Sequence, residues 1–189
     1  MATATDAGSA QYDKSLLKQC GEDVFISANI EIRRPQLISV GSHTAIDSHV
    51  YITTGAEIGD YVHISPFTSI IGGASAMLYM GHFTGMAAGC RIICASDEHL
   101  GHGLTNPTVP EAYRDNVNIA PVRFENFATV GSNVIIMPGI TLGEGCVVGA
   151  NSLVTKDLQP WTIYVGSPAR AVKVRPRERM LAFAAEMGY

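Results

Sequence analysis

The chain has 189 residues, which suits one domain or one domain with small appendages. Its 47% hydrophobic content excludes disorder as the dominant state, and 13 basic against 17 acidic residues exclude the basic stripe that neutralises nucleic-acid phosphates. The sequence shows neither a secretory signal nor an apolar run near ~18 residues, so we expect a soluble cytoplasmic protein without a membrane-inserted segment.

Residues 1–23 precede the regular part of the sequence. They include "YDKSLLKQCGED", a pattern typical of a short amphipathic helix. We therefore expect a tail followed by a short helix that caps the first repeat.

A large apolar residue recurs every six positions through most of the chain. The first run is Val40, Ile46, Ile52, Ile58, Ile64 and Ile70, and the second is Phe124, Val130, Ile136, Leu142, Val148 and Val154. A period of six fits neither a helix nor a long alternating strand, but it fits a short strand followed by a turn. Strands repeated at this period stack in parallel, so the sequence predicts an all-β solenoid.

Four cysteines are scattered through the chain. The close pair, Cys90 and Cys94, has the wrong spacing for a CxxC redox or zinc motif. We expect Cys94 and Cys146 to be small hydrophobic residues of the core.

The repeat stops between Ile92 and Phe124. An interruption of about thirty residues is long for a structureless loop and is typical of a functional one. Polar and titratable side chains gather here: Asp97, Glu98, His99, His102, Thr105, Asn106, Glu111, Tyr113, Arg114 and Asp115. The sequence predicts that residues 96–121 leave the solenoid and carry reacting groups.

Two features follow the last repeat. The stretch "VGSPARAVK" offers Arg170 and Lys173 as cations suited to phosphate groups, although its glycine and proline also suit an ordinary turn out of the solenoid. Residues 175–189 then carry apolar side chains at helical spacing, which predicts a short helix that caps the exposed end of the solenoid.

The stretch "VGSNVIIMPGITLGEGCVVGANSLVTKDL" followed by "PWTIYVGSPARAVK" resembles the hexapeptide-repeat acyltransferases. The resemblance covers residues 24–174 and implies a left-handed parallel β-helix with three hexads to a coil, a handedness opposite to the one that general crossover rules favour. It also implies a homotrimer, in which the coenzyme A groove lies between adjacent solenoids and the loop of one subunit covers its neighbour.

The resemblance places a catalytic base in the loop. Acyl transfer requires a proton to leave the nucleophile, and histidine is the side chain best suited to accept a proton near neutral pH. We interpret His99 as the base, with Asp97 or Glu98 orienting it or holding the substrate. This chain reads "SDEH" where many members of the family read roughly "SHD" or "SDD", so Asp97 itself and His102 are alternative bases.

Other polar residues are candidates for binding the substrate. In the loop these are His102, Asn106 and Tyr113, and His82 in "MGHFTGMAAG" falls on a turn near the start of the loop. We expect His43, His49 and His63 to point outward at turns or corners.

The segment "VGSPARAVK" resembles the part of the family that contacts coenzyme A. The implied contacts are Ser167, Pro168, Ala169, Arg170 and Lys173, with Gly149, Ala150 and Ser152 on the last coil as a wall for the pantetheine arm. Trp161 can either stack on the adenine or pack on the last coil. Acetyl-CoA is thus the expected co-substrate, and no metal is expected.

The loop motif "LTNPTVP" and the compact size are most similar to sugar acetyltransferases of bacterial surface-polysaccharide pathways, such as lipopolysaccharide biosynthesis. The expected reaction is acetyl transfer to a nucleotide-linked amino sugar or to a sugar hydroxyl. The alternatives are a galactoside or antibiotic acetyltransferase and a non-enzymatic solenoid scaffold. A zinc carbonic anhydrase is disfavoured because the six histidines lack the spacing of a three-histidine site.

Overall fold

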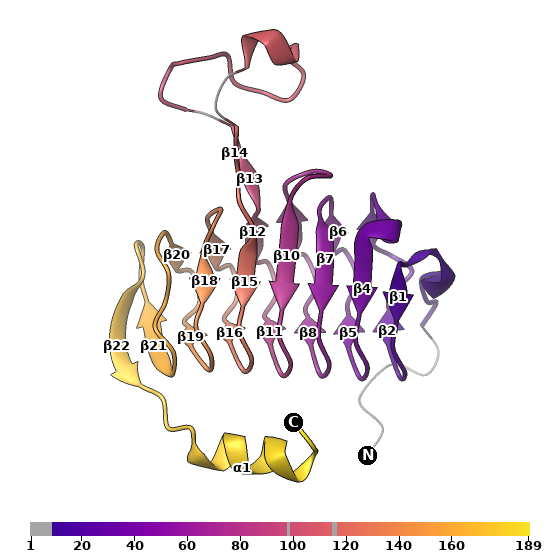
Figure 1. Ribbon diagram of the computed structural model, residues 1–189, viewed down its shortest axis with the longest axis vertical. Helices are drawn as coiled ribbons and strands as arrows, with labels where there is room; N and C mark the ends of the chain where they lie inside the picture. The colour runs from indigo at the N-terminus through magenta and orange to yellow at the C-terminus, as the bar shows by residue number, and fades with distance from the viewer. Residues whose placement is uncertain (1–8, 98, 115–116) are drawn as a thin grey trace.

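The repeated hexads fold as short parallel strands on the three sides of a solenoid (Figure 1). The computed structural model describes residues 9–97, 99–114 and 117–189. Sheet 1 contains β1 (Gln19–Cys20), β4 (Ile38–Val40), β7 (Gly55–Ile58), β10 (Met77–Met80), β15 (Val122–Phe124) and β18 (Thr141–Leu142). Sheet 2 contains β2 (Phe25–Ile26), β5 (Ala45–Ile46), β8 (His63–Ile64), β11 (Gly85–Met86), β16 (Thr129–Val130), β19 (Val147–Val148), β21 (Thr162–Val165) and β22 (Arg170–Val174). Sheet 3 contains β3 (Glu31–Ile32), β6 (Tyr51–Ile52), β9 (Ser69–Ile71), β12 (Arg91–Ile93), β17 (Ile135–Ile136) and β20 (Leu153–Val154).

One strand from each sheet makes a coil. Coil 1 contains β1 to β3, coil 2 β4 to β6, coil 3 β7 to β9, coil 4 β10 to β12, coil 5 β15 to β17, and coil 6 β18 to β20. The fold is a left-handed parallel β-helix, which confirms the predicted class. The chain also forms the 3-10 turns η1 (Lys14–Leu16), η2 (Pro35–Leu37) and η3 (Glu111–Tyr113) and the helix α1 (Glu178–Glu186).

The hexad positions face one another in register from coil to coil. Ile46 pairs with Ile64 on sheet 2, and Ile52 pairs with Ile70 on sheet 3. All four side chains are fully buried. Burying a side chain of this size stabilises a fold by about 1.5–3 kcal/mol, so a column of such residues on each sheet holds the coils together. The six-residue period therefore marks the inward-facing positions, as predicted.

The predicted excursion leaves the solenoid at the corner between sheets 3 and 1. After β12 the strands β13 (Ala95–Ser96) and β14 (Asn118–Ile119) pair antiparallel as a short stalk, and the chain re-enters the solenoid at β15. We call residues 96–121 the long loop. Figure 1 shows it projecting away from all three sheets, with η3 near its tip.

The turns between sheets 1 and 2 carry a column of aromatic rings. Five residues at this corner have left-handed backbone conformations: His43 (φ 56°), Tyr61 (56°), Phe83 (58°) and Phe127 (64°) in coils 2 to 5, and Trp161 (51°) just before β21. In coil 6, between Phe127 and Trp161, the corner residue is Gly145 (φ 64°). This conformation costs roughly 1–2 kcal/mol for a residue with a Cβ. Stacking of the rings, with centroids 4.7 to 5.3 Å apart from His43 to Phe127, offsets part of that cost. We call these five residues the aromatic column.

The helix α1 packs along the aromatic column and not over the end of the solenoid (Figure 1). Ala184 of α1 is buried against Phe127 and Trp161, and the Tyr189 hydroxyl donates a hydrogen bond to Asp60 Oδ2 at 2.9 Å. The predicted capping role of the helix is therefore wrong. The edge of the last coil is covered instead by β22, which pairs antiparallel with β21.

In the described part of the chain, no helix is long and apolar enough to cross a membrane.

The helix expected before residue 24 is reduced to the single turn η1. Asp13 caps the N-terminus of this turn, because its side chain accepts a hydrogen bond from the Ser15 backbone N–H at 3.1 Å. The chain then enters β1, which already pairs with β4 of the second coil. The first coil therefore starts at Gln19, five residues before the predicted start.

We predict that the folded protein protects three of its four thiols. Cys90, Cys94 and Cys146 are fully buried, which confirms the core positions expected for the last two. Burial raises the pKa of Cys94 to about 11 and that of Cys146 to about 12, so both stay protonated and unreactive near neutral pH. An aromatic disulfide reagent should label at most Cys20 in the native protein and all four cysteines in urea. Rapid labelling of a second native thiol would contradict this packing.

Candidate active site

The base of the long loop holds the candidate catalytic residues. Asp97 directly follows β13 and is half-buried, whereas His99 is exposed. The Ser96 hydroxyl donates to the backbone carbonyl of Asp97 at 3.2 Å and lies 3.5 Å from His99 Nε2. Glu98, the third predicted residue, lies outside the described residues. Asp97 and His99 are therefore both placed at the start of the loop, and Ser96 contacts the backbone of the first and the ring of the second.

The outer part of the long loop holds three substrate-binding candidates. Asn106 has a φ of 110°, and its side-chain oxygen accepts hydrogen bonds from the N–H and the hydroxyl of Thr108 at 3.2 and 3.1 Å. The carbonyl of Tyr113 accepts from the Leu104 N–H at 2.9 Å, while its side chain is exposed, as is that of His102. The Asn106 side chain thus stabilises the conformation of the loop, whereas the side chains of Tyr113 and His102 lie on the surface of the loop.

The long loop also exposes large apolar side chains. Leu104 is 63% exposed, Tyr113 65% and Ile119 48%. Several such side chains on one projecting segment are typical of a contact surface. This observation fits the expectation that the loop covers a neighbouring subunit.

His82 lies at the corner between sheets 1 and 2, away from the long loop of its own chain. Its Nδ1 accepts a hydrogen bond from the Asp60 N–H at 3.0 Å, and its backbone N–H donates to Asn126 Oδ1 at 2.8 Å. The ring of Tyr189 stands 5.0 Å from the His82 ring, centroid to centroid. Within one chain His82 therefore joins the end of the C-terminal segment, and its contact with substrate stays a prediction.

The residues assigned to coenzyme A come together at the corner between sheets 2 and 3. Gly149 and Ala150 form the turn from β19 to β20, and residues 166–169 lie beside it. The Leu153 N–H donates to the Gly166 carbonyl at 3.1 Å, and the Ala169 N–H donates to the Leu153 carbonyl at 2.8 Å. A Cβ at Gly149 would crowd the Val165 side chain, so glycine keeps this surface thin. We call Gly149, Ala150 and residues 166–169 the donor wall.

Two residues near the donor wall have structural roles. Ser152 is buried, and its hydroxyl accepts a hydrogen bond from the Gly166 N–H at 2.9 Å, so it supports the wall from inside. Trp161 is 5% exposed, and its Nε1 donates to Glu144 Oε2 at 3.1 Å. Of the two interpretations of Trp161, packing on the last coil is therefore correct.

Arg170 and Lys173 provide positive charge next to the donor wall. Both side chains are exposed on β22, opposite Val165 and Ile163 of β21. The Arg170 Nη1 donates to the Ala169 carbonyl at 3.0 Å, which directs the guanidinium back toward the wall. A thin wall flanked by two cations fits a ligand that combines a narrow arm with phosphate groups.

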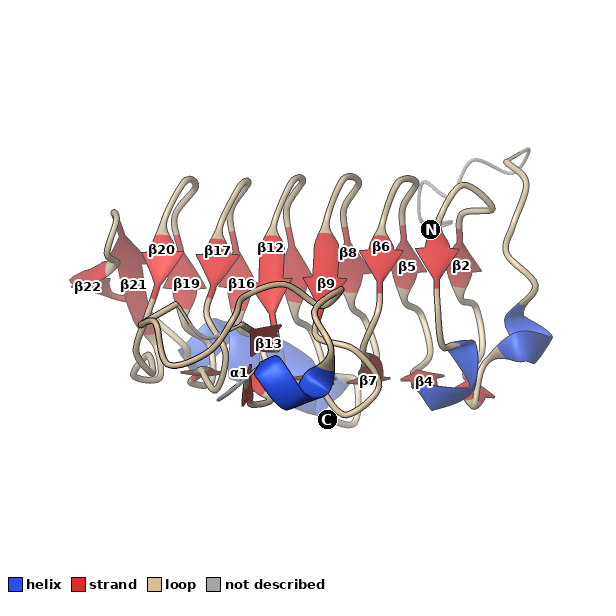
Figure 2. Cartoon of the chain, turned by 90° about the horizontal axis from the view of Figure 1, so that it is seen from above, coloured by secondary structure: helices blue, strands red, loops and turns tan. Residues whose placement is uncertain are grey.

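The candidate groups lie at different corners of one chain. The long loop leaves at the corner between sheets 3 and 1, and the donor wall lies at the corner between sheets 2 and 3 (Figure 2). His82 occupies the remaining corner. A single chain therefore does not gather all the predicted residues into one cleft. Among residues 9–97, 99–114 and 117–189, no group of three or more His, Cys, Asp or Glu side chains is placed to hold a metal ion.

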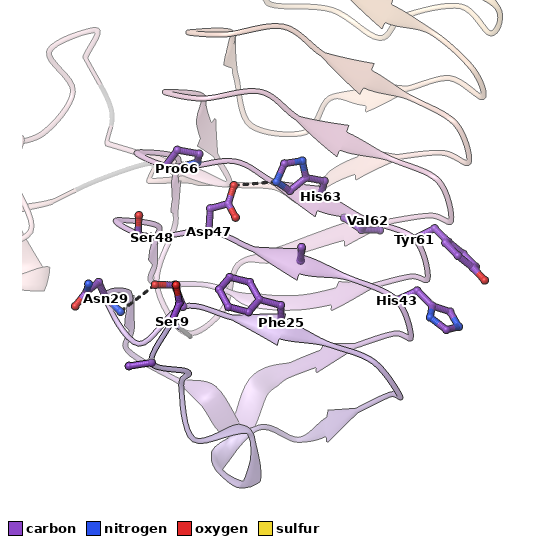
Figure 3. Close-up of a pocket in the computed structure, with 13 residues that line it drawn as sticks. Ser9, Phe25, Asn29, His43, Asp47, Ser48, Tyr61, Val62, His63 and Pro66 are labelled. Atoms are coloured by element: carbon purple, nitrogen blue, oxygen red, sulfur yellow. Dashed lines mark hydrogen bonds and ion pairs between the residues drawn. The ribbon is translucent and has the colours of Figure 1, made fainter. Parts of the chain in front are cut away.

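A cavity of about 710 Å³ on the outer face of sheet 2 contains none of the predicted site residues (Figure 3). Phe25 and His63 stand on its floor, and His63 Nε2 lies 2.8 Å from Asp47 Oδ2. His63 points outward, as expected, but it lies on β8 and not at a turn. The sequence could have revealed this lining. The residue just before each buried aliphatic residue lies on the same strand and faces outward, so His63, which precedes Ile64, could have been placed on the outer face of a strand.

Comparison with known proteins places the chain in a family. A family model, the hexapeptide repeat of succinyl-transferase, matches residues 121–156. The chain is 29% identical over 164 residues to the dTDP-4-amino-4,6-dideoxy-D-glucose acyltransferase of Escherichia coli, covering 85% of this chain and 84% of that one. It also matches the crystal structure of AntD, an N-acyltransferase from Bacillus cereus, in complex with dTDP and 3-hydroxybutyryl-CoA, with a TM-score of 0.88, 32% identity and coverage of 96% and 100%. The chain belongs to the hexapeptide-repeat acyltransferases.

Two further members of the hexapeptide-repeat acyltransferases are similar to it. A serine-to-cysteine variant of AntD in complex with dTDP-4-amino-4,6-dideoxyglucose and coenzyme A matches with a TM-score of 0.89, 30% identity and coverage of 96% of this chain and 98% of that one. A chloramphenicol acetyltransferase of Agrobacterium fabrum is 33% identical over 120 residues, which are 58% of this chain and 57% of that one. As a hexapeptide-repeat acyltransferase, the protein is an enzyme that transfers acyl groups.

Proposed function

We propose that this enzyme transfers an acyl group, acetyl in the simplest case, from acyl-CoA to the amino group of a nucleotide-linked amino sugar. The observation that carries the proposal is the similarity to AntD along nearly the whole chain, because AntD structures contain dTDP, a dTDP-linked 4-amino sugar, and coenzyme A or its acyl derivative. The Escherichia coli relative is named for the same sugar. An amine is therefore favoured over a hydroxyl as the nucleophile.

The donor wall supports acyl-CoA as the donor. Gly149 and Ala150 offer the thin surface that a pantetheine arm needs, and Arg170 and Lys173 offer charge to its phosphates. When bound, acyl-CoA supplies the thioester carbonyl that the nucleophile attacks. Backbone N–H groups at the solenoid corner are suited to stabilise the charge that develops on that oxygen.

The long loop supplies side chains that can remove a proton from the acceptor. The amine loses a proton as its nitrogen bonds to the acyl carbon, and His99 is our first candidate to accept it. Asp97, half-buried one position after β13, is suited to hold the acceptor amine or to take the proton itself. His102 stays an alternative base, and Glu98 stays a candidate to orient His99 or to hold the substrate.

We propose that the complete site forms between chains of a homotrimer. In one chain the long loop and the donor wall lie at opposite edges of sheet 3 (Figure 2). A second copy is therefore needed to bring a loop against a donor wall, and the exposed apolar side chains of the loop suit that contact. In this proposal acyl transfer depends on assembly.

The proposed substrates also suggest a cellular compartment and a pathway for the enzyme. Acyl-CoA and nucleotide sugars are cytoplasmic metabolites, and acylated amino sugars are building blocks of bacterial surface polysaccharides such as lipopolysaccharide. We therefore propose a cytoplasmic enzyme that modifies a precursor of such a polymer.

Replacing Arg170 and Lys173 together by alanine should raise the KM for acyl-CoA. A charge-assisted hydrogen bond to phosphate is worth about 1.5–3 kcal/mol, which corresponds to a roughly 10- to 100-fold change. The kcat should change little, because neither side chain is placed at the reacting carbonyl. Steady-state kinetics with varied acetyl-CoA measure both values. Lys156→Ala removes an exposed cation after β20 and serves as the control, and an unchanged KM in the double variant would exclude these cations as phosphate contacts.

The proposed function is tested by release of free coenzyme A from acetyl-CoA with a panel of acceptors. The panel contains dTDP- and UDP-linked amino sugars, the corresponding sugars with a hydroxyl in place of the amine, a free galactoside and chloramphenicol. We expect turnover with a nucleotide-linked amino sugar and little with the hydroxyl analogues. Turnover with chloramphenicol or the galactoside alone would replace the proposal by the antibiotic or galactoside alternative. Turnover of none of these acceptors would contradict the proposal; concentration-dependent filaments would then favour a scaffold, whereas a discrete trimer would exclude one.

A further inference from the structure

The cavity on sheet 2 and the donor wall lie along the same corner of the solenoid. Asn29, Ser48 and Pro66 line the cavity at the corner between sheets 2 and 3 in coils 1, 2 and 3. Ala150 of the donor wall lies at this corner in coil 6. At ~4.8 Å per coil, about 15 Å separate coil 3 from coil 6. The long loop leaves from coil 4, so cavity, loop and donor wall follow one another along the axis.

The lining of the cavity suits a planar heterocycle. Figure 3 shows Phe25, Asn29, Asp47 and His63 gathered on the outer face of sheet 2. An aromatic ring offers a stacking surface, and the Asn29 amide can both donate to and accept from the edge of a pyrimidine. A volume of about 710 Å³ is in the usual range for small-molecule sites, and the described lining residues include no lysine or arginine. The cavity therefore suits the base of a nucleotide better than its phosphates.

Arg91 provides the missing cation one coil further along. It lies on β12 of coil 4, and its Nη1 donates to the carbonyls of Phe67, Gly89 and Cys90 at 2.9, 2.6 and 3.0 Å. Phe67 directly follows Pro66 of the cavity lining, so the guanidinium is anchored at the corner beside the cavity, on the side that faces the donor wall. A diphosphate leaving the cavity toward coil 4 would reach this guanidinium.

We propose that the cavity binds the pyrimidine base of the acceptor nucleotide and that Arg91 contacts its diphosphate. This inference rests on the proposed function and adds the position of the acceptor to it. The amino sugar, attached to the far phosphate, is then carried along this corner to the level of coil 4, where the long loop of a neighbouring chain would meet it in the proposed homotrimer. Donor and acceptor would approach the reacting position from opposite ends of the same corner.

The test is titration calorimetry of the assembled enzyme with dTDP. Phe25→Leu removes the stacking surface, and Arg91→Gln removes the cation while keeping a polar side chain. Each substitution should raise the Kd for dTDP roughly 10-fold or more, while the Kd for coenzyme A stays within about twofold. The matched control is Tyr79→Leu with Arg123→Gln, because these residues form an aromatic and arginine pair at 3.9 Å on the outer face of sheet 1. The control should bind dTDP as the wild type does.

A second readout on the wild type does not depend on the folding of variants. Irradiation with the diphosphate of 4-thiothymidine, followed by peptide mapping, should place the label within residues 25–29 or 45–66. Label confined to the long loop or to sheet 1 would overturn the assignment, as would dTDP affinities within twofold of wild type in both variants. If the wild type acylates a dTDP-linked amino sugar in either of these cases, only the cavity assignment fails. If the wild type neither binds dTDP nor acylates such a sugar, the proposed function fails as well.

Discussion

We expect His99→Ala to lower kcat about 10²- to 10⁴-fold, the range for loss of a general base. The imidazole lies at the start of the long loop, 3.5 Å from the Ser96 hydroxyl. In our proposal it accepts the proton that the acceptor amine releases. The variant should bind acyl-CoA nearly as the wild type does, because the proposal assigns His99 to the proton of the acceptor amine and gives it no contact with the donor. Initial rates of coenzyme A release at saturating substrates measure the effect.

Three companion variants complete this experiment. Asp97→Asn should lower kcat less than His99→Ala if the carboxylate only orients the substrate, and Glu111→Gln, at an exposed loop position, should leave kcat unchanged. His102→Ala tests the remaining histidine of the loop. If His99→Ala retains nearly full kcat while Asp97→Asn or His102→Ala loses 10²-fold or more, the assignment of His99 is wrong and the base is the residue whose loss matters.

Trp161→Ala should lower the free energy of unfolding by about 3–5 kcal/mol, as for other buried tryptophans truncated to alanine. Trp161 is 5% exposed and packs in one cluster with Phe127 and Ala184. Gly145 leaves room for the indole, since a Cβ there would meet the Trp161 ring. The substitution therefore removes one of the contacts that join α1 to the aromatic column. Urea denaturation followed by circular dichroism, at one fixed protein concentration because assembly contributes to stability, measures the change.

Phe183→Ala is the matched control for this loss. Phe183 lies on the same helix but is 48% exposed, with Arg179 over its ring at 5.1 Å. Surface substitutions usually change stability by no more than about 0.5 kcal/mol. An effect of Trp161→Ala as small as that of Phe183→Ala would contradict the packing of α1 on the aromatic column.

The fold was predictable because one residue class repeats at one period. In a solenoid the same position of each hexad faces the core, so Ile46, Ile64 and their counterparts only have to be large and apolar, and such residues at a fixed period leave a strong sequence signal.

The corner between sheets 1 and 2 was not predictable in the same way. His43, Tyr61 and Phe83 adopt left-handed conformations that non-glycine residues usually avoid, and only stacking between coils makes them favourable. The position of α1 follows from that stacking and was missed for the same reason.

The candidate site was predictable only in part. The long loop was predicted because it interrupts the repeat, and the donor wall was predicted from the resemblance of "VGSPARAVK" to the family segment that contacts coenzyme A. The cavity of sheet 2 was missed because Phe25, His63 and Asp47 are brought together by coil stacking from positions some twenty residues apart. His82 was placed near the loop by its position in the sequence, but a corner of the solenoid lies between them. Nearness along the chain is a poor guide in a solenoid, because each hexad turns to another face.

In the proposed homotrimer the long loop of one chain completes the donor wall of another. This arrangement is tested most directly by mixing two variants, His99→Ala and Arg170→Ala with Lys173→Ala, unfolding them together at equal concentration and refolding them. At limiting acyl-CoA each variant alone should be nearly inactive. If the two groups come from different chains, randomly mixed trimers should recover roughly a quarter of the wild-type activity, because some of their sites join an intact loop to an intact wall. Mixed trimers without any recovered activity would show that both groups serve the same site from the same chain and would contradict the account.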